Sequence, residues 1–291
     1  MHKRIEVFGV INTAILSLLC VTMLYPFWNS IVKSFSANSA ILQGRVFLWP
    51  VGFNVLGYVQ LLRDQLFYVS MRNSAIIVVF GTALRLLLAL MAGYAFSKGG
   101  LRFRRPLLLA FVLTMFFNGG IIPTFLIIDL LGLYDTRAVL ILFGAMPVFH
   151  MVLAMSFFGQ IPASVEESAF MDGANYWQVF TRIVLPMSKA LIATLVIFNA
   201  VNLYNMFMPA VLYTRSVHNY VIQLYLRIRV FAAEAAAAGD METQLMMDQQ
   251  DTGSESMKMA ALAIASIPII LIYPFFQSYF IKGVTLGAVK A

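Results

Sequence analysis

Residues 162–186, PASVEESAFMDGANYWQVFTRIVLP, are a polar segment between two long apolar stretches of the chain. Its acidic side chains come early, at Glu166 and Glu167, and the pair Asp172 and Gly173 interrupts it. Because the flanking stretches are almost entirely hydrocarbon, we expect this segment to be where another protein exerts force on the chain.

The composition of the chain indicates a membrane protein. Of its 291 residues, 61% are hydrophobic and 11% are charged, and the mean hydropathy is +0.84. A soluble domain of this length cannot bury so much apolar surface, whereas a bilayer can. The net charge of +7 does not indicate nucleic-acid binding, because the basic residues are scattered or lie beside apolar stretches. The single cysteine, Cys20, excludes an intramolecular disulfide.

Six apolar stretches are long enough to cross a bilayer as helices, since about 20 residues at 1.5 Å each span about 30 Å. The sequence lacks the alternating ten-residue segments of a membrane barrel. We therefore predict an all-α, polytopic protein with one transmembrane domain over residues 1–291. The six predicted spans are residues 7–32, 70–96, 107–129, 138–158, 188–212 and 258–280.

Basic residues in short loops set the orientation of the spans. The tightest cluster lies between the second and third spans and predicts a cytoplasmic loop there; it consists of Lys98, Arg102, Arg104 and Arg105. Both termini and the loop 159–187 are then cytoplasmic, and the loops 33–69 and 213–257 lie outside. The first span is too long for a signal peptide, and we interpret it as uncleaved.

The outer loop 213–257 holds nearly half of the chain's 13 acidic residues, namely Glu234, Asp240, Glu242, Asp248, Asp251 and Glu255. Two interpretations stay open. The loop is either a solvated, partly disordered segment or a contact surface for a partner outside the membrane.

The cytoplasmic loop has the pattern of two short helices. Pro162 suits the start of the first helix, and Ser164 with Glu167 fits a capping box. Gly173 permits a turn because glycine accepts a positive φ. The apolar residues of the second helix recur at helical spacing; they are Tyr176, Val179, Phe180 and Ile183. Leu185-Pro186 is predicted to end this helix.

Three groups of residues recur in this loop at a characteristic spacing: Glu167-Ser168-Ala169, Asp172-Gly173-Ala174 and Ile183-Val184-Leu185-Pro186. The pattern resembles the EAA loop of permease subunits in ATP-binding-cassette importers. One departure from the family is Ser168, where the family has alanine. The segments 117–124, 273–276 and 280–291 are similar to the carbohydrate-importer branch, so the likeness extends over most of the chain.

The resemblance implies a type I importer permease in a bacterial cytoplasmic membrane. It implies a second permease subunit, two ATPase subunits that hold the ATP and magnesium, and an extracytoplasmic binding protein for an oligosaccharide. Cell-wall oligosaccharides, including uronates such as alginate fragments, are compatible with it. The tail would reach between the ATPases, and the 213–257 loop would enter the sugar cleft of the binding protein.

The resemblance also implies which residues dock on the ATPase. They are Glu166, Glu167, Ser168, Ala169, Asp172, Gly173 and Ala174. The alternative for the two glutamates is that they only complement the dipole of the first helical turn.

Amide side chains recur along the fifth span, at Asn199, Asn202 and Asn205, with Tyr204 beside them. Residues three apart drift slowly around one face of a helix, so the amides form a stripe. The stripe either lines the sugar path, since amides bond hydroxyl groups, or joins helices through hydrogen bonds, worth about 1 kcal/mol each. In the second span, Arg85 is costly at mid-depth and must snorkel or pair.

No enzyme chemistry is indicated. The sequence has no phosphate-binding Gly-rich loop, so we expect this chain to bind no ATP and no cofactor. Its three histidines lie on separate elements without metal-ligand spacing. Two other classes were considered. A membrane-embedded transferase would need a polar catalytic cluster, and a channel would need a selectivity filter or a charged ring.

Overall fold

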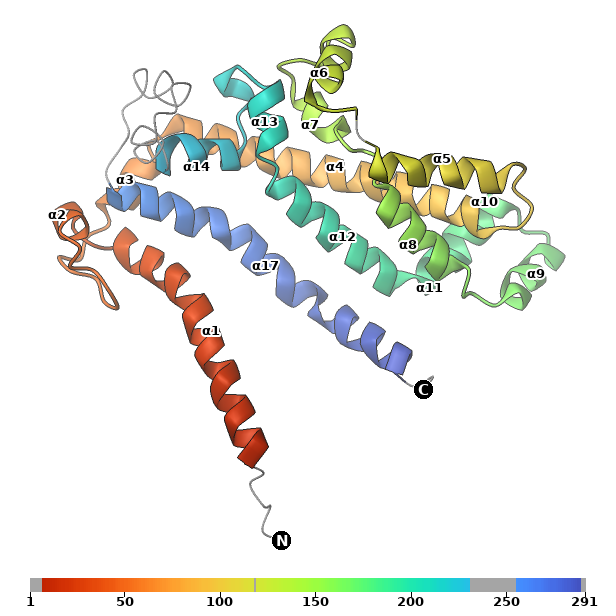
Figure 1. Ribbon diagram of the computed structural model, residues 1–291, viewed down its shortest axis with the longest axis horizontal. Helices are drawn as coiled ribbons and strands as arrows, with labels where there is room; N and C mark the ends of the chain where they lie inside the picture. Colours follow the sequence, from red (N-terminus) through yellow and green to blue (C-terminus); the bar gives the residue numbers. More distant parts are fainter. Residues whose placement is uncertain (1–6, 118, 231–254, 289–291) are drawn as a thin grey trace. The chain divides into compact units, whose positions relative to one another are not determined.

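The computed structural model describes residues 7–117, 119–230 and 255–288, and every regular element in these residues is a helix (Figure 1). This agrees with the predicted all-α class. Three helices are individually long and apolar enough to cross a membrane, and three bent helix pairs bring the number of candidate spans to as many as six. The first pair, α5 and α6, is bent by 114°.

The chain divides into two compact units, residues 1–68 with 225–268 and residues 69–224 with 269–291. In the first unit, α1 (Val7–Ser34) is followed by the short helices α2 (Asn38–Leu42) and α3 (Leu56–Leu61). Three helices have residues in both units: α4 (Gln65–Ser97), α14 (Ile222–Val230) and α17 (Glu255–Ala288).

The second unit contains the remaining helices and both predicted sites. These helices are α5 (Arg104–Phe116), α6 (Ile121–Leu130), α7 (Arg137–Leu142), α8 (Val148–Phe158), α9 (Ala163–Met171), α10 (Tyr176–Val179), the π-helical turn η1 (Phe180–Val184), α11 (Leu185–Met187), α12 (Lys189–Tyr204), α13 (Met208–Tyr213) and the 3₁₀ turn η2 (Val217–Asn219).

Each predicted span has helical counterparts, but only three of the six are single helices. The first, second and sixth correspond to α1, α4 and α17, whereas the other three are each divided between two helices. Two of these divisions lie next to prolines. Pro147 precedes α8, and Pro209 occupies the first turn of α13, where its fixed φ and missing N–H suit a helix start. These two prolines therefore mark the starts of new helices.

The core of the second unit joins α4, α8 and α12 to the predicted cytoplasmic loop 159–187, which we call the coupling loop. Its buried residues are Leu90, Tyr94, Ala154, Phe158, Val179, Phe180, Val184, Leu191 and Leu195. Gly93 lets α4 and α8 approach closely, because a Cβ at Gly93 would lie 2.6 Å from the Cβ of Ala154. Small residues at such crossings are typical of membrane helices, which associate by close packing.

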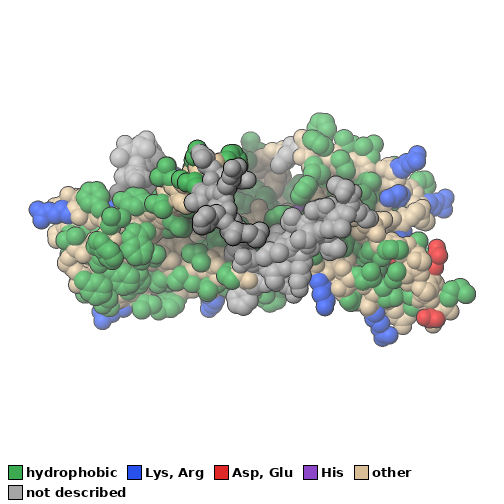
Figure 2. Space-filling view, turned by 90° about the horizontal axis from the view of Figure 1, so that it is seen from below, with side chains coloured by type: hydrophobic (Ala, Val, Ile, Leu, Met, Phe, Trp, Pro, Cys, Tyr) green, Lys and Arg blue, Asp and Glu red, His purple; other side chains and the backbone are tan. Residues whose placement is uncertain are grey.

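Much of the surface is hydrophobic, as in a protein surrounded by lipid and partner chains. Hydrophobic side chains cover large areas of the face that Figure 2 shows. Helix α1 is the extreme case, since none of the residues in its apolar window is buried within the chain. An exposed apolar surface of this kind is typical of segments that contact lipid or another protein.

Asp135 ties the turn between α6 and α7 to residues 213–219. Its carboxylate accepts hydrogen bonds from the backbone N–H groups of Arg215 and Ser216, both at 2.9 Å, and from the Ser216 hydroxyl and the Asn219 amide. Burial opposes its ionisation, but these hydrogen bonds outweigh burial and lower the pKa of Asp135 well below its usual range. The ionised carboxylate thus fixes the start of the loop after α13.

Residues 231–254 and 289–291 lie outside the described part of the chain. They hold most of the acidic residues predicted for the outer loop, from Glu234 to Asp251, and the end of the tail motif. Asn118, in the 117–124 motif, lies outside it too.

Candidate functional site: the coupling loop and a cavity between broken helices

The first helix of the coupling loop, α9, ends in a Schellman motif. The N–H of Gly173 donates to the carbonyl of Phe170, and the N–H of Ala174 donates to the carbonyl of Ala169, both at 3.0 Å. Gly173 has a φ of +83°, so the predicted turn with a positive φ is confirmed. A Cβ at Gly173 would meet nothing within 4 Å, so only backbone conformation requires glycine there.

The capping box predicted at Ser164 and Glu167 is wrong. The residue that caps α9 is Pro162, which has no side-chain hydrogen bond to the helix, and Ser164 lies inside the first turn. A capping box is present one helix later, where Asn175 accepts from the N–H of Gln178 at 2.9 Å and Gln178 accepts from the N–H of Asn175 at 2.8 Å.

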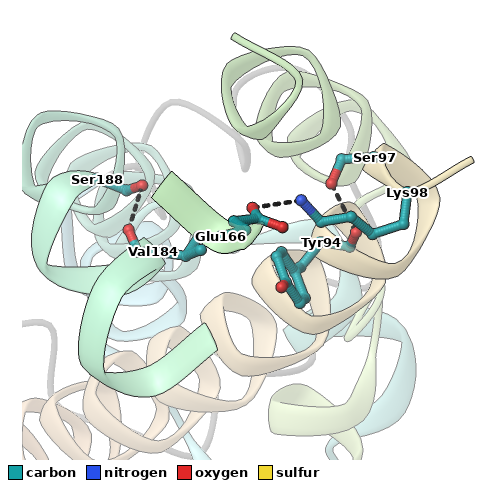
Figure 3. Close-up of polar contacts among 6 residues, drawn as sticks. All are labelled: Tyr94, Ser97, Lys98, Glu166, Val184 and Ser188. Atoms are coloured by element: carbon teal, nitrogen blue, oxygen red, sulfur yellow. Dashed lines mark hydrogen bonds and ion pairs between the residues drawn. The ribbon is translucent and has the colours of Figure 1, made fainter. Parts of the chain in front are cut away.

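The second helix of the coupling loop runs from α10 through η1 to α11. Pro186 was predicted to end it, but the break comes at Ser188, and α12 continues at an angle of 82°. The π-helical turn precedes Pro186 because proline lacks the N–H that would bond the carbonyl of Arg182 in an α-helix. The Ser188 hydroxyl bonds the carbonyl of Val184 at 2.7 Å and holds the bend (Figure 3).

The two helices of the coupling loop are buried to different degrees. Val179, Phe180 and Val184, from the second helix, belong to the core of the unit. The first helix, α9, has Glu166 as its one buried residue. A push on α9 is therefore transmitted through a short turn to a helix packed among α4, α8 and α12, because close-packed interiors transmit displacement.

Glu166 forms an ion pair with Lys98, which directly follows α4 (Figure 3). The Glu166 residue is only 7% exposed, and the Lys98 ammonium also lies over the ring of Tyr94, 4.6 Å from its centroid. The pair lines a hollow of about 750 Å³ between the end of α4 and α9, with Glu167 and Tyr176 also on its wall. Glu166 thus fastens α9 to α4.

The other predicted docking residues differ in exposure. Glu167, Ser168, Asp172 and Gly173 are exposed, and Ala169 and Ala174 are half-buried. The Ser168 hydroxyl bonds the carbonyl of Ser164 at 2.7 Å, so serine replaces the family's alanine without leaving the helix. Large apolar side chains are exposed beside them: Met171 at 88%, Tyr176 at 70% and Trp177 at 57%.

A cavity of about 1080 Å³ lies where two of the predicted spans are broken. One wall is the break 143–147 between α7 and α8, and another is the break 205–207 between α12 and α13. Of the amide stripe, Asn202 and Asn205 line the cavity.

The remaining residues of the stripe are buried in the unit and do not line this cavity. Asn199 is fully buried and donates to the carbonyl of Leu195 at 2.8 Å. Tyr204 is 6% exposed.

Arg85 of α4 reaches the same cavity and joins its walls. Its Nη1 donates to Oδ1 of Asn202 at 2.8 Å, and its Nη2 donates to the carbonyl of Phe143 at 2.7 Å. Arg85 and Asn202 are each conspicuous in the sequence, but nothing in the sequence indicates their contact. The sequence shows a cation in one predicted span and an amide in another, but it does not show which residues pair. The Lys98–Glu166 pair, 68 positions apart, was missed for the same reason.

Comparisons with known proteins agree with this architecture. The chain is 37% identical over 274 residues to the polygalacturonan/rhamnogalacturonan transport system permease protein YtcP of Bacillus subtilis, covering 94% of both chains. It is 33% identical, with a TM-score of 0.85, to a chain in the crystal structure of a bacterial ABC transporter involved in the import of the acidic polysaccharide alginate, covering 96% of this chain and 99% of that one.

A further solved structure, a bacterial alginate ABC transporter in complex with an alginate pentasaccharide-bound periplasmic protein, has 17% identity and a TM-score of 0.60, which shows a shared fold. Residues 5–286 match the family described as the inner membrane component of binding-protein-dependent transport systems. With so much of its length matched, the chain belongs to this family of inner-membrane permeases.

Proposed function

We propose that this chain is one of two permease subunits of an importer that moves oligosaccharides into a bacterial cell, driven by two ATPase subunits. Its family and its relatives' roles in sugar import support the transport function. The ATP and magnesium belong to the partner ATPases, and a binding protein outside the membrane delivers the sugar. The cytoplasmic side carries both termini and the coupling loop.

The arrangement of the coupling loop carries this proposal. Glu166 is neutralised within the chain by Lys98, whereas the neighbouring Glu167 is exposed beside Met171 and Tyr176. An exposed carboxylate next to large apolar side chains fits a docking surface, with the apolar groups supplying contact area and the charge supplying orientation. We assign the contact with a basic residue of the ATPase to Glu167.

The substrate class follows from the relatives. One is named for polygalacturonan and rhamnogalacturonan transport, and another belongs to an alginate importer. Cell-wall oligosaccharides that contain uronic acids are therefore the proposed cargo of this importer.

Uptake of labelled oligosaccharides in cells tests the function. We expect a strain that lacks this chain to lose uptake of at least one uronate-containing or neutral oligosaccharide, and the wild-type chain to restore it. Glu167→Ala should restore less uptake than wild type at equal membrane levels. Unchanged uptake of the whole panel in the deletion strain would contradict the proposal.

A further inference from the structure

The charge of Arg85 is not neutralised by any carboxylate in the part of the chain that the structure describes. The side chain is 95% buried, its two hydrogen-bond partners are a neutral amide and a backbone carbonyl, and its Nε has no partner among those residues. Burying an unpaired cation costs free energy, so such residues in a membrane span usually serve function. The guanidinium also has five N–H donors, more than these two contacts use.

The position of Arg85 is that of a ligand-binding group. It lines the cavity of about 1080 Å³ at the meeting point of two broken helices, the arrangement that forms substrate sites in many transporters. The N-terminus of α8 begins at the cavity wall after Pro147 and has no side-chain cap, so it adds a partial positive charge. Asn202 and Asn205 on the same wall offer amides that bond sugar hydroxyls.

We propose that Arg85 binds the carboxylate groups of an acidic oligosaccharide in this cavity and gives the importer a preference for uronate-containing over neutral sugars. The proposal rests on the proposed function and adds the group that determines specificity. A guanidinium matches a carboxylate in shape and charge, and their charge-assisted hydrogen bonds are stronger than neutral ones. Asn202 holds Nη1 and Phe143 holds Nη2, so the cation is positioned before the sugar arrives.

The complete importer, with its partner subunits and binding protein, is reconstituted in proteoliposomes with ATP. Uptake is measured for a uronate oligosaccharide and for the same oligosaccharide with its carboxyl groups reduced to alcohols. The readout is the ratio of acidic to neutral uptake, because a general loss of assembled importer affects both sugars equally. We compare Arg85→Gln, Arg85→Lys and Arg72→Gln, the last an exposed arginine of the same helix outside the cavity.

Arg85→Gln should lower the ratio of acidic to neutral uptake about tenfold, the effect of losing one charge-assisted hydrogen bond. Arg85→Lys should keep most of the wild-type ratio, and Arg72→Gln should match wild type. If the importer moves only the acidic sugar, loss in Arg85→Gln with retention in Arg85→Lys supports the proposal, and equal loss in both overturns it.

An unchanged ratio in Arg85→Gln overturns the proposal. So does a wild-type importer that moves only neutral sugars, in which case the proposed oligosaccharide import stands but the proposed uronate cargo does not. A wild-type complex that moves no oligosaccharide contradicts the proposed function itself.

Discussion

Two cations, Arg85 within α4 and Lys98 directly after it, have opposite surroundings. Just after the last residue of this helix, Lys98 is neutralised by Glu166 and fastens the coupling loop to the helix. In the middle of α4, Arg85 is held by an amide and a carbonyl, and no carboxylate among the described residues neutralises its charge. The first arrangement braces the coupling loop, whereas the second leaves a positioned charge facing a cavity. In the proposed importer, this difference separates the part of the chain that receives force from the part that meets the sugar.

The largest effect is expected from disturbing the turn of the coupling loop while leaving both cations in place. Gly173→Val places a β-branched residue at a φ of +83°, a strain of about 1–2 kcal/mol that moves α9 relative to the second helix. We expect uptake to fall about tenfold while ATP hydrolysis continues, as in an uncoupled transporter. Gly173→Asn, which tolerates this conformation, is the control and should retain uptake.

The roles of the two neighbouring glutamates can be distinguished, because substituting one should weaken ATPase association and substituting the other should reduce stability. Glu167→Gln should weaken association with the ATPase several-fold without changing the stability of the permease, because its carboxylate is exposed and has no role in the core. Co-purification of the ATPase and thermal unfolding of the solubilised complex measure the two properties. Equal ATPase retention in wild type and Glu167→Gln would contradict the assignment of Glu167 to docking.

Glu166→Gln should instead reduce stability, by about 1–3 kcal/mol, since Lys98 then loses its charged partner in a partly buried site. Thermal unfolding of the solubilised chain measures the loss. The double variant Glu166→Gln with Lys98→Met removes both charges and should recover part of the stability. If the double variant loses more stability than the two single variants lose together, the pair does not interact as described.

A smaller effect is expected at Asp135, far from both cations in the sequence. Its pKa is lowered by the hydrogen bonds to its carboxylate, so its contribution to stability is full above the usual aspartate range and is lost as the pH falls through the lowered pKa. Asp135→Asn should therefore be less stable than wild type at neutral pH, and the difference should shrink in acid. Unfolding midpoints of both proteins across this pH range give the measurement, and a constant difference would contradict it.

Much of the fold follows from the sequence, because apolar length and the positions of prolines are local properties. The six apolar stretches of the sequence each have helical counterparts. The divisions inside three of them were not predicted. Breaks such as 143–147 are stabilised by long-range contacts, here the bond from Arg85 to Phe143, which no local pattern contains.

The coupling loop was recognised from its motif, and the turn at Gly173 followed from the special conformation that glycine permits. Its capping was predicted at the wrong helix, because both Ser164 and Asn175 have a suitable partner three residues later and the sequence cannot rank them. The different roles of Glu166 and Glu167 depend on Lys98, which lies next to Glu166 only in the folded chain.

The central claim, that the coupling loop faces the ATPases in the cytoplasm, is tested by labelling a cysteine at Asp172. Because Cys20 is the only native cysteine, Cys20→Ala provides a clean background, and Arg45→Cys, in the predicted outer loop 33–69, provides the opposite control. With a membrane-impermeant thiol reagent, Asp172→Cys should react only after the cells are opened and Arg45→Cys in intact cells. Labelling of Asp172→Cys in intact cells would contradict the account.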